Sequence, residues 1–161
     1  MSDQDTEPAA EPREGGAQFS LQRIYMKDMS FESPRSPAGF RGQWRPKVNL
    51  ELNSRYSEIE ESHYEVVLSL TTTARDDADE VVYLVEVQQA GIFLVKGMAG
   101  DALQQTLGSF CPNVLFPYAR EAIDSIVTRG SFPPLMLAPV NFDAIYEQAK
   151  AQREQKEHPT Q

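Results

Sequence analysis

Apolar and polar residues alternate with a period of two in the first half of the chain, which is the pattern of half-buried β-strands. The pattern covers residues 19–32, 47–53 and 64–73, and a fourth stretch rich in β-branched residues covers 81–89. In the first stretch one parity carries Phe19, Leu21, Tyr25, Met29 and Phe31. The fourth is apolar on both parities, so we expect it to be covered on both faces. One set of its side chains then needs a second subunit or a bound apolar segment, unless the loop before residue 47 folds over them: Val81, Tyr83, Val85 and Val87.

After Gly100 the apolar spacing changes to three and four residues, which predicts helices. A short helix is expected over 102–107, a second from Pro117 to Gly130, and a third that Asn141 caps. A block of strands followed by a block of helices predicts an α+β fold, with a four-stranded antiparallel sheet covered on one face by C-terminal helices.

The two ends of the chain are polar. We expect residues 1–17 to form a disordered acidic tail, 18–151 a single folded domain, and 152–161 a disordered C-terminal tail. The first 18 residues lack the apolar core of a signal peptide, and no run approaches the 18 apolar residues of a membrane-spanning helix.

The chain has 161 residues and a formal net charge of −9. This charge disfavours binding to nucleic acid or to an anionic membrane, so a charged partner is expected to be basic. The single cysteine excludes an internal disulfide and, with two histidines, leaves too few ligands for a zinc cage. We therefore expect a cytoplasmic protein with no metal and no other cofactor.

No motif indicates catalysis. Cys111 and His63 would have to meet to form a nucleophile pair, whereas a buried thiol that begins a helix explains Cys111 more simply. Adjacent carboxylates such as Glu60 and Glu61 lack apolar surroundings that would separate their pKa values. We predict that the protein is not an enzyme.

One surface feature does emerge from strand parity. Asp28 and Glu32 share a face of the first strand, and Leu84 and Glu86 share a face of the fourth. If the two faces coincide, the sheet presents an acidic surface suited to a compact cationic partner; the alternative is a merely solvated face.

Four blocks of sequence carry a family resemblance: QRIYMKDMSFE (22–32), EVQQAGIF (86–93), CPNVLFPYARE (111–121) and SFPPLMLAPVNFDA (131–144). In this order they resemble the SecB family of protein-export chaperones, over about residues 19–146. The resemblance implies a homotetramer, built as a dimer of dimers. It also implies an ATP-independent holdase that keeps unfolded precursor proteins translocation-competent in the bacterial cytoplasm and delivers them to the translocation motor SecA.

The resemblance also implies roles for individual residues. The motor-docking positions are Asp28, Glu32, Leu84 and Glu86, and their partner is the motor's zinc-containing C-terminal module, to which the zinc belongs. The oligomer-interface positions are Val85, Val87 and Gln89. The candidates for a client-binding groove, each of which has a core-packing alternative, are Trp44, Val48, Leu50, Leu52, Phe132, Leu135 and Phe142. Ala90 departs from the glycine of the family pattern. The rival function is an acidic homo-oligomeric scaffold that recruits one folded basic partner.

Overall fold

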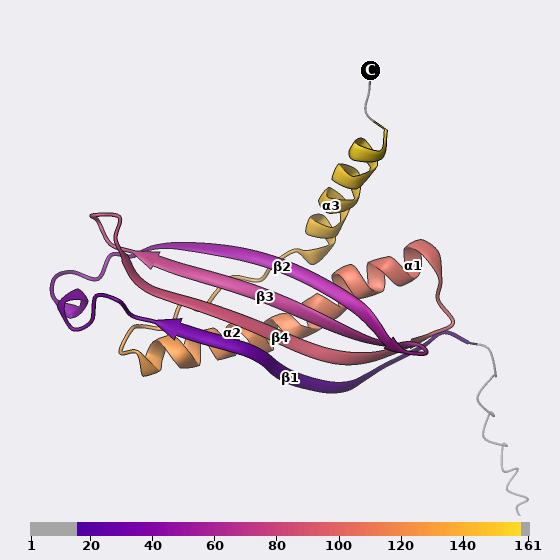
Figure 1. Ribbon diagram of the computed structural model, residues 1–161, viewed down its shortest axis with the longest axis horizontal. Helices are drawn as coiled ribbons and strands as arrows, with labels where there is room; N and C mark the ends of the chain where they lie inside the picture. The colour runs from indigo at the N-terminus through magenta and orange to yellow at the C-terminus, as the bar shows by residue number, and fades with distance from the viewer. Residues whose placement is uncertain (1–15, 159–161) are drawn as a thin grey trace, which may run out of the picture.

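The computed structural model describes residues 16–158, which form a four-stranded antiparallel sheet with helices on one side (Figure 1). The sheet has the order β1-β4-β3-β2. The α+β fold class predicted from the pattern is confirmed. The strands are β1 (Gln18–Glu32), β2 (Lys47–Glu60), β3 (His63–Arg75) and β4 (Val81–Lys96).

Two strands extend beyond their predicted ends. β2 continues from the apolar stretch through a polar segment to Glu60, and β4 continues to Lys96. Pairing with β3 holds the polar end of β2, from Asn53 opposite Ser69 to Glu60 opposite His63. Backbone pairing therefore extends the strand where the side chains give no period-two signal.

Two register shifts in β1 alter which residues share a face. The shifts lie between Leu21 and Arg23 and between Met26 and Asp28. Each β-bulge inserts a residue and reverses the parity of the side chains that follow it. Tyr25 is therefore opposite Ala90 and lies on the face without helices, contrary to the single parity expected for it. We call the helix-free side the open face and the other side the covered face.

The helical half is α1 (Gly100–Gln105), a π-helical turn η2 (Thr106–Phe110), α2 (Cys111–Arg129) and α3 (Phe142–Glu157); a short 3-10 turn, η1 (Ala38–Phe40), precedes β2. Gly130 ends α2, and the side chain of Asn141 caps α3 by accepting from the backbone N–H of Ala144 at 3.0 Å, as predicted.

The expected start of the second helix at Pro117 is wrong. α2 begins at Cys111, and Pro117 stands inside it. The buried residues Cys111, Leu115 and Ala119 extend the apolar face backwards through the proline at a spacing of four. Burial of this face compensates for the backbone hydrogen bond that a proline removes.

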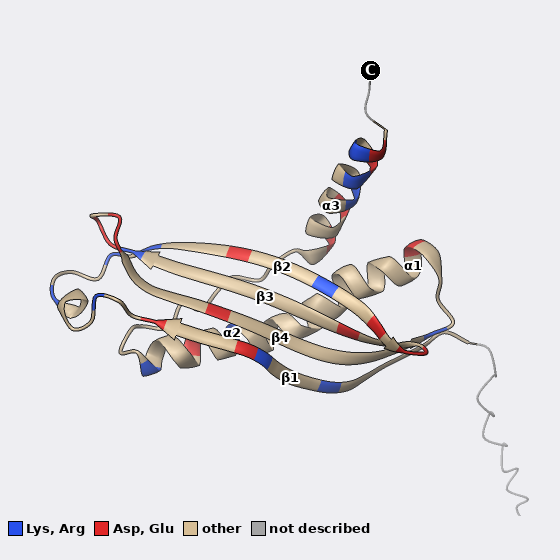
Figure 2. Ribbon diagram, in the orientation of Figure 1, with Lys and Arg blue, Asp and Glu red and all other residues tan. Residues whose placement is uncertain are grey.

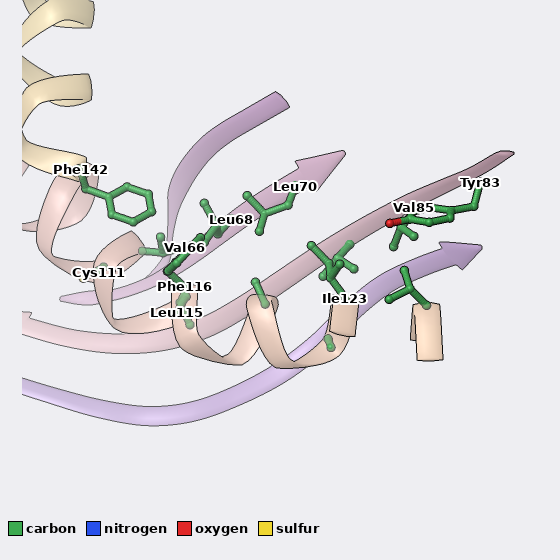
Figure 3. Close-up of a cluster of buried hydrophobic side chains, with 14 of the residues drawn as sticks. Val66, Leu68, Leu70, Tyr83, Val85, Cys111, Leu115, Phe116, Ile123 and Phe142 are labelled. Atoms are coloured by element: carbon green, nitrogen blue, oxygen red, sulfur yellow. The ribbon is translucent and has the colours of Figure 1, made fainter. Parts of the chain in front are cut away.

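The core lies between the covered face and α2 (Figure 3). Val66, Leu68 and Leu70 of β3 meet Leu115 and Ile123 of α2 in this layer, and each of the five is fully buried. α2 follows the sheet along its length, whereas α3 extends away from it (Figure 1).

The predicted oligomer-interface positions lie inside the subunit. Val85, Val87 and Gln89 are 0, 1 and 5 % exposed and lie on the covered face, beneath helices of the same chain. Any effect of these residues on a second subunit would have to pass through the helices that cover them, and their role at an oligomer interface stays a prediction. The same finding removes the predicted need for a second cover over β4. The β4 side chains of the other parity lie on the open face, where Leu84 is half-buried and Glu86 is exposed.

The C-terminal end of the chain is helical further than the sequence predicted. α3 continues to Glu157, so the expected C-terminal disorder from residue 152 is wrong up to that point. The acidic tail predicted for residues 1–17 lies almost entirely outside the described residues. None of the helices in residues 16–158 combines the length and apolar composition that crossing a bilayer requires.

Candidate functional site

The open face brings together the four residues expected to dock a basic partner. Glu32 pairs with Leu84 across β1 and β4, and two residues away Ser30 pairs with Glu86 and donates a hydrogen bond to its carboxylate at 3.5 Å. Asp28 follows in the next pair. The prediction that these residues share a face is confirmed, and Figure 2 shows their acidic positions on neighbouring strands. We call Asp28, Glu32, Leu84 and Glu86 the acidic patch.

Next to the acidic patch, a carboxylate of the open face is neutralised by a lysine of the same face. Glu65 of β3 accepts hydrogen bonds from the Tyr25 hydroxyl and, at 2.7 Å, from the Lys27 ammonium of β1. These side chains meet across β4, where Ala90 is small. Hydrogen bonds from Lys27 and then from Tyr25 lower the pKa of Glu65, whereas burial and the bond to Glu65 raise the pKa of Tyr25 to about 12. The carboxylates of the acidic patch, by contrast, have no ion-pair partner among the described residues.

A second surface forms on the covered face, at the end of the sheet where the β1–β2 loop folds back. Trp44 stacks on Tyr83 with ring centroids 6.2 Å apart and lies 5.3 Å from Phe132. Phe40 also lies 5.3 Å from Phe132. Phe31 completes the group, which we call the aromatic cluster. The early loop thus supplies part of the cover over β4, as one of the sequence interpretations proposed.

An apolar row continues from the aromatic cluster along β2. Val48, Leu50 and Leu52 alternate on the covered face, opposite Ala74, Thr72 and Leu70 of β3. The row ends at a hollow of about 360 Å³ between β2 and α3, whose walls include Leu52, Tyr56 and Phe142. Trp44, Val48 and Tyr56 are 39, 41 and 42 % exposed. Five side chains form what we call the apolar strip: Trp44, Val48, Leu50, Leu52 and Tyr56.

The segment between α2 and α3 is held in place by one carboxylate. Asp124 of α2 accepts hydrogen bonds from the backbone N–H of Leu135 at 2.9 Å and of Met136 at 3.2 Å. Leu135 is half-buried against the core, and Met136 is 76 % exposed. These two hydrogen bonds fix the position of the segment, which exposes the apolar side chain of Met136 to solvent.

The structure divides the seven groove candidates. Four form part of the apolar strip: Trp44, Val48, Leu50 and Leu52. Phe132 and Phe142 are only 5 and 4 % exposed, and Phe142 packs 5.8 Å from Phe116, so the core-packing alternative describes both. Leu135 is intermediate.

Sequence reasoning missed Phe40 and Tyr56, which lie in a loop and in a segment without periodic pattern. Pairing of β2 with β3 beyond Asn53 places Tyr56 opposite Val66 on the covered face, which the side-chain pattern alone does not show.

The structure argues against the Cys111 nucleophile. Cys111 is fully buried on the covered side, and burial raises the pKa of its thiol to about 12, the opposite of activation. His63 pairs with Leu94 on the open face, so the sheet lies between the two residues. Within residues 16–158, no three His, Cys, Asp or Glu side chains are grouped as a metal site requires.

Comparison with known proteins adds independent findings. The family model described as Preprotein translocase subunit SecB matches residues 12–153. The Protein-export protein SecB of Pseudomonas syringae pv. syringae is 58 % identical over 161 residues, covering 99 % of both chains. That of Stutzerimonas stutzeri is 61 % identical over 143 residues, covering 89 % of this chain and 87 % of the relative.

A solved structure shares the fold. It is a SecB-like chaperone of Mycobacterium tuberculosis in complex with a peptide from an antitoxin, and it covers 76 % of this chain and 90 % of its own. The TM-score is 0.62 at 19 % identity, so this likeness concerns the fold alone. From the family model and the relatives, the chain belongs to the SecB family.

Proposed function

We propose that this protein is an ATP-independent export chaperone that holds unfolded precursor proteins in the cytoplasm and delivers them to the motor SecA. The observation that carries the proposal is the exposed apolar strip beside the aromatic cluster. Three of its large side chains are about 40 % exposed: Val48 and Tyr56 on the edge strand β2, and Trp44 in the loop that precedes it. Such contiguous apolar surface on a chain of net charge −9 is typical of an interaction site.

The dimensions of the strip suit an extended client. From Val48 to Tyr56 the strand advances eight residues, or about 26 Å at 3.3 Å per residue, which accommodates about eight residues of extended chain. Each covered square ångström of apolar surface contributes roughly 25 cal/mol before ordering costs are subtracted. A single strip therefore binds weakly, and several strips in one assembly raise the avidity for a long client.

The acidic patch is our proposed docking site for SecA. Its three carboxylates extend along β1 and β4 from Leu84, which is paired with Glu32, and none of them has an ion-pair partner among residues 16–158. A small basic module with an apolar contact complements this arrangement. The partner we propose is the zinc-containing C-terminal module of SecA.

The homotetramer is likewise a proposal, and β1 supports it. This edge strand exposes 36–38 % of four apolar side chains on the side of the sheet that the helices cover: Phe19, Leu21, Met26 and Met29. A second copy paired along the edge of β1 would bury this row, and two such dimers make the dimer of dimers.

A light-scattering assay tests the holdase function. A stoichiometric amount of the protein should suppress aggregation of a slowly folding precursor without ATP. The variant Val48→Ser with Tyr56→Ser should lose this suppression, because it makes the apolar strip polar. The variant Tyr118→Ser, which removes an aromatic ring that is 50 % exposed on α2, is the matched control and should retain it.

The acidic patch also favours a second candidate, an acidic homo-oligomeric scaffold that recruits one folded basic partner. A scaffold would leave aggregation of the precursor unchanged while still binding its basic partner. That result contradicts the holdase proposal.

A further inference from the structure

The chain between α2 and α3 crosses residues 133–140 without regular structure, and we call this stretch the linker (Figure 1). Three of its eight residues are prolines, which have no backbone N–H to donate. The N–H groups of Leu135 and Met136 donate to the Oδ1 atom of Asp124 at 2.9 and 3.2 Å. Within residues 16–158 the linker makes no other hydrogen bond, so Asp124 is its only polar anchor.

The linker is held in a backbone conformation that its sequence does not favour. Met136 has a φ of 51°, in the left-handed region that a residue with a Cβ rarely adopts. Its side chain is 76 % exposed, so packing of that side chain does not hold this angle. Two successive N–H groups turned towards one oxygen form a concave site for an anion, and the Asp124 carboxylate occupies it. Asp124 therefore stabilises the strained angle.

Asp124 is itself held by α2 beside the aromatic cluster. It is half-buried and directly follows Ile123, which is fully buried against the sheet. Its charge also acts on the aromatic cluster, because burial and then the negative charge of Asp124 raise the pKa of Tyr83 to about 12. One carboxylate of a core helix thus serves the linker and stands close to the aromatic cluster.

The linker connects two parts of the apolar surface that we propose for clients. It starts directly after Phe132, whose ring lies 5.3 Å from that of Trp44 in the aromatic cluster. It ends just before α3, whose first residue, Phe142, lines the hollow of about 360 Å³ beside the apolar strip. Leu135 packs against the core from the linker, and Met136 is exposed. The position of the linker therefore determines the shape of the surface between the aromatic cluster and the hollow.

We propose that Asp124 is a positioning residue of the client site, which holds the linker as a preformed wall and so slows the release of a bound client. A wall that is already ordered loses less conformational entropy when a client packs against it than a mobile wall does. Changes in binding of this kind appear mainly in the dissociation rate constant. The inference rests on the proposed holdase function and adds a residue that acts through the linker.

The test measures release of a peptide from the full-length protein by stopped-flow fluorescence after dilution. Trp44 is the only tryptophan and belongs to the aromatic cluster, so its fluorescence reports occupancy by a phenylalanine-rich synthetic peptide without tryptophan. Asp124→Ala removes both hydrogen bonds and should release the peptide about tenfold faster, with an association rate constant within about twofold of the original. Asp124→Asn keeps an acceptor oxygen and should restore most of the slow release.

Two controls separate this role from a general loss of stability. Alanine is favourable inside helices, so α2 should persist in Asp124→Ala, and amide hydrogen exchange should accelerate in the linker but not in the core strands. Glu65→Gln weakens hydrogen bonds on the open face and lowers the free energy of unfolding there. It should release the peptide at the original rate.

Peptide release at the original rate from Asp124→Ala, or equal acceleration in Glu65→Gln, would overturn the inference and leave the holdase proposal standing. If Asp124→Ala does not fold, Asp124→Asn decides, since its peptide release should accelerate in step with amide exchange of its linker. Faster exchange with unchanged release would overturn the inference. If the unaltered protein does not bind the peptide, both proposals fail.

Discussion

Reversal of one charge in the acidic patch tests the assignment of its role. Asp28, Glu32 and Glu86 together carry −3, and Glu86→Lys changes this to −1. Position 86 pairs with Ser30, so Asp28 and Glu32 are its diagonal neighbours, about 7 to 8 Å away. The new lysine therefore removes one carboxylate and competes with the partner for the other two.

The size of the effect follows from these distances. Two unit charges 7.5 Å apart interact by about 0.5 kcal/mol in water and about 2 kcal/mol at an effective dielectric constant of 20. Loss of one exposed ion pair and gain of a like-charge contact together amount to about 1–2 kcal/mol. The affinity for a basic partner should therefore fall by about 5- to 30-fold.

Titration calorimetry with the zinc-loaded C-terminal module of SecA measures this change at two salt concentrations. Client binding should stay near normal, because the sheet separates the acidic patch from the apolar strip. Glu121→Lys makes the same change in net charge on an exposed position of α2 and should have little effect. Equal losses in the two variants would refute the docking assignment, and loss of client binding together with docking would indicate misfolding.

Four further predictions concern the interior and the open face. Phe132→Ala should lower the free energy of unfolding by about 3–5 kcal/mol in urea titrations, because Phe132 is buried among four aromatic rings; a loss below 1 kcal/mol would contradict its core role. Tyr83→Phe should leave that free energy unchanged or raise it by about 1 kcal/mol, since its buried hydroxyl has no hydrogen-bond partner in the described chain; clear destabilisation would reveal a missed partner. Because the Lys27 bond lowers the pKa of Glu65 below its ordinary value of 4.5, its stabilisation is present above that pH and is lost as the pH falls through the lowered value. Glu65→Gln should thus cost most at neutral pH, and a pH-independent difference in unfolding free energy would argue against the pair. Cys111 should react with a thiol reagent only on unfolding, because it is buried and its pKa is about 12, and rapid labelling of the native protein would contradict this.

The parts of the fold that follow from local pattern were predictable. Alternation placed all four strands, the Asn141 side chain caps α3, and Gly130 ends α2. The bulges in β1 were not predictable, because a bulge depends on pairing with β4 and leaves only a broken alternation, here at Ile24 and Met26, in the sequence. The predicted helical start at Pro117 was wrong. A proline inside a helix costs a backbone hydrogen bond, and burial of one long apolar face outweighs this cost in α2.

The candidate site also has features that were predictable from the sequence and features that were not. Parity placed Asp28 with Glu32 and Leu84 with Glu86, and it left open whether the two faces coincide. The pairing of β1 with β4 decides that they do. Parity did not show which side of β4 the helices cover, so the burial of Val85 in the core of its own subunit could not be predicted. The cavity of about 310 Å³ at one end of the sheet combines the β1–β2 loop with Arg75 at the end of β3, a juxtaposition that only the folded chain makes.

The alternation of β4 has a consequence for handover. Val85 and Val87 pack beneath the helices, and Glu86 between them belongs to the acidic patch. If the apolar strip holds the client and the acidic patch docks the motor, as we propose, the two partners approach opposite sides of one layer and need not compete sterically for a subunit. Motor binding is then expected to be non-competitive with client binding. The shortest covalent link between the two sides is the backbone of β4, where one peptide bond separates the packing residue Val85 from Glu86, our proposed docking residue.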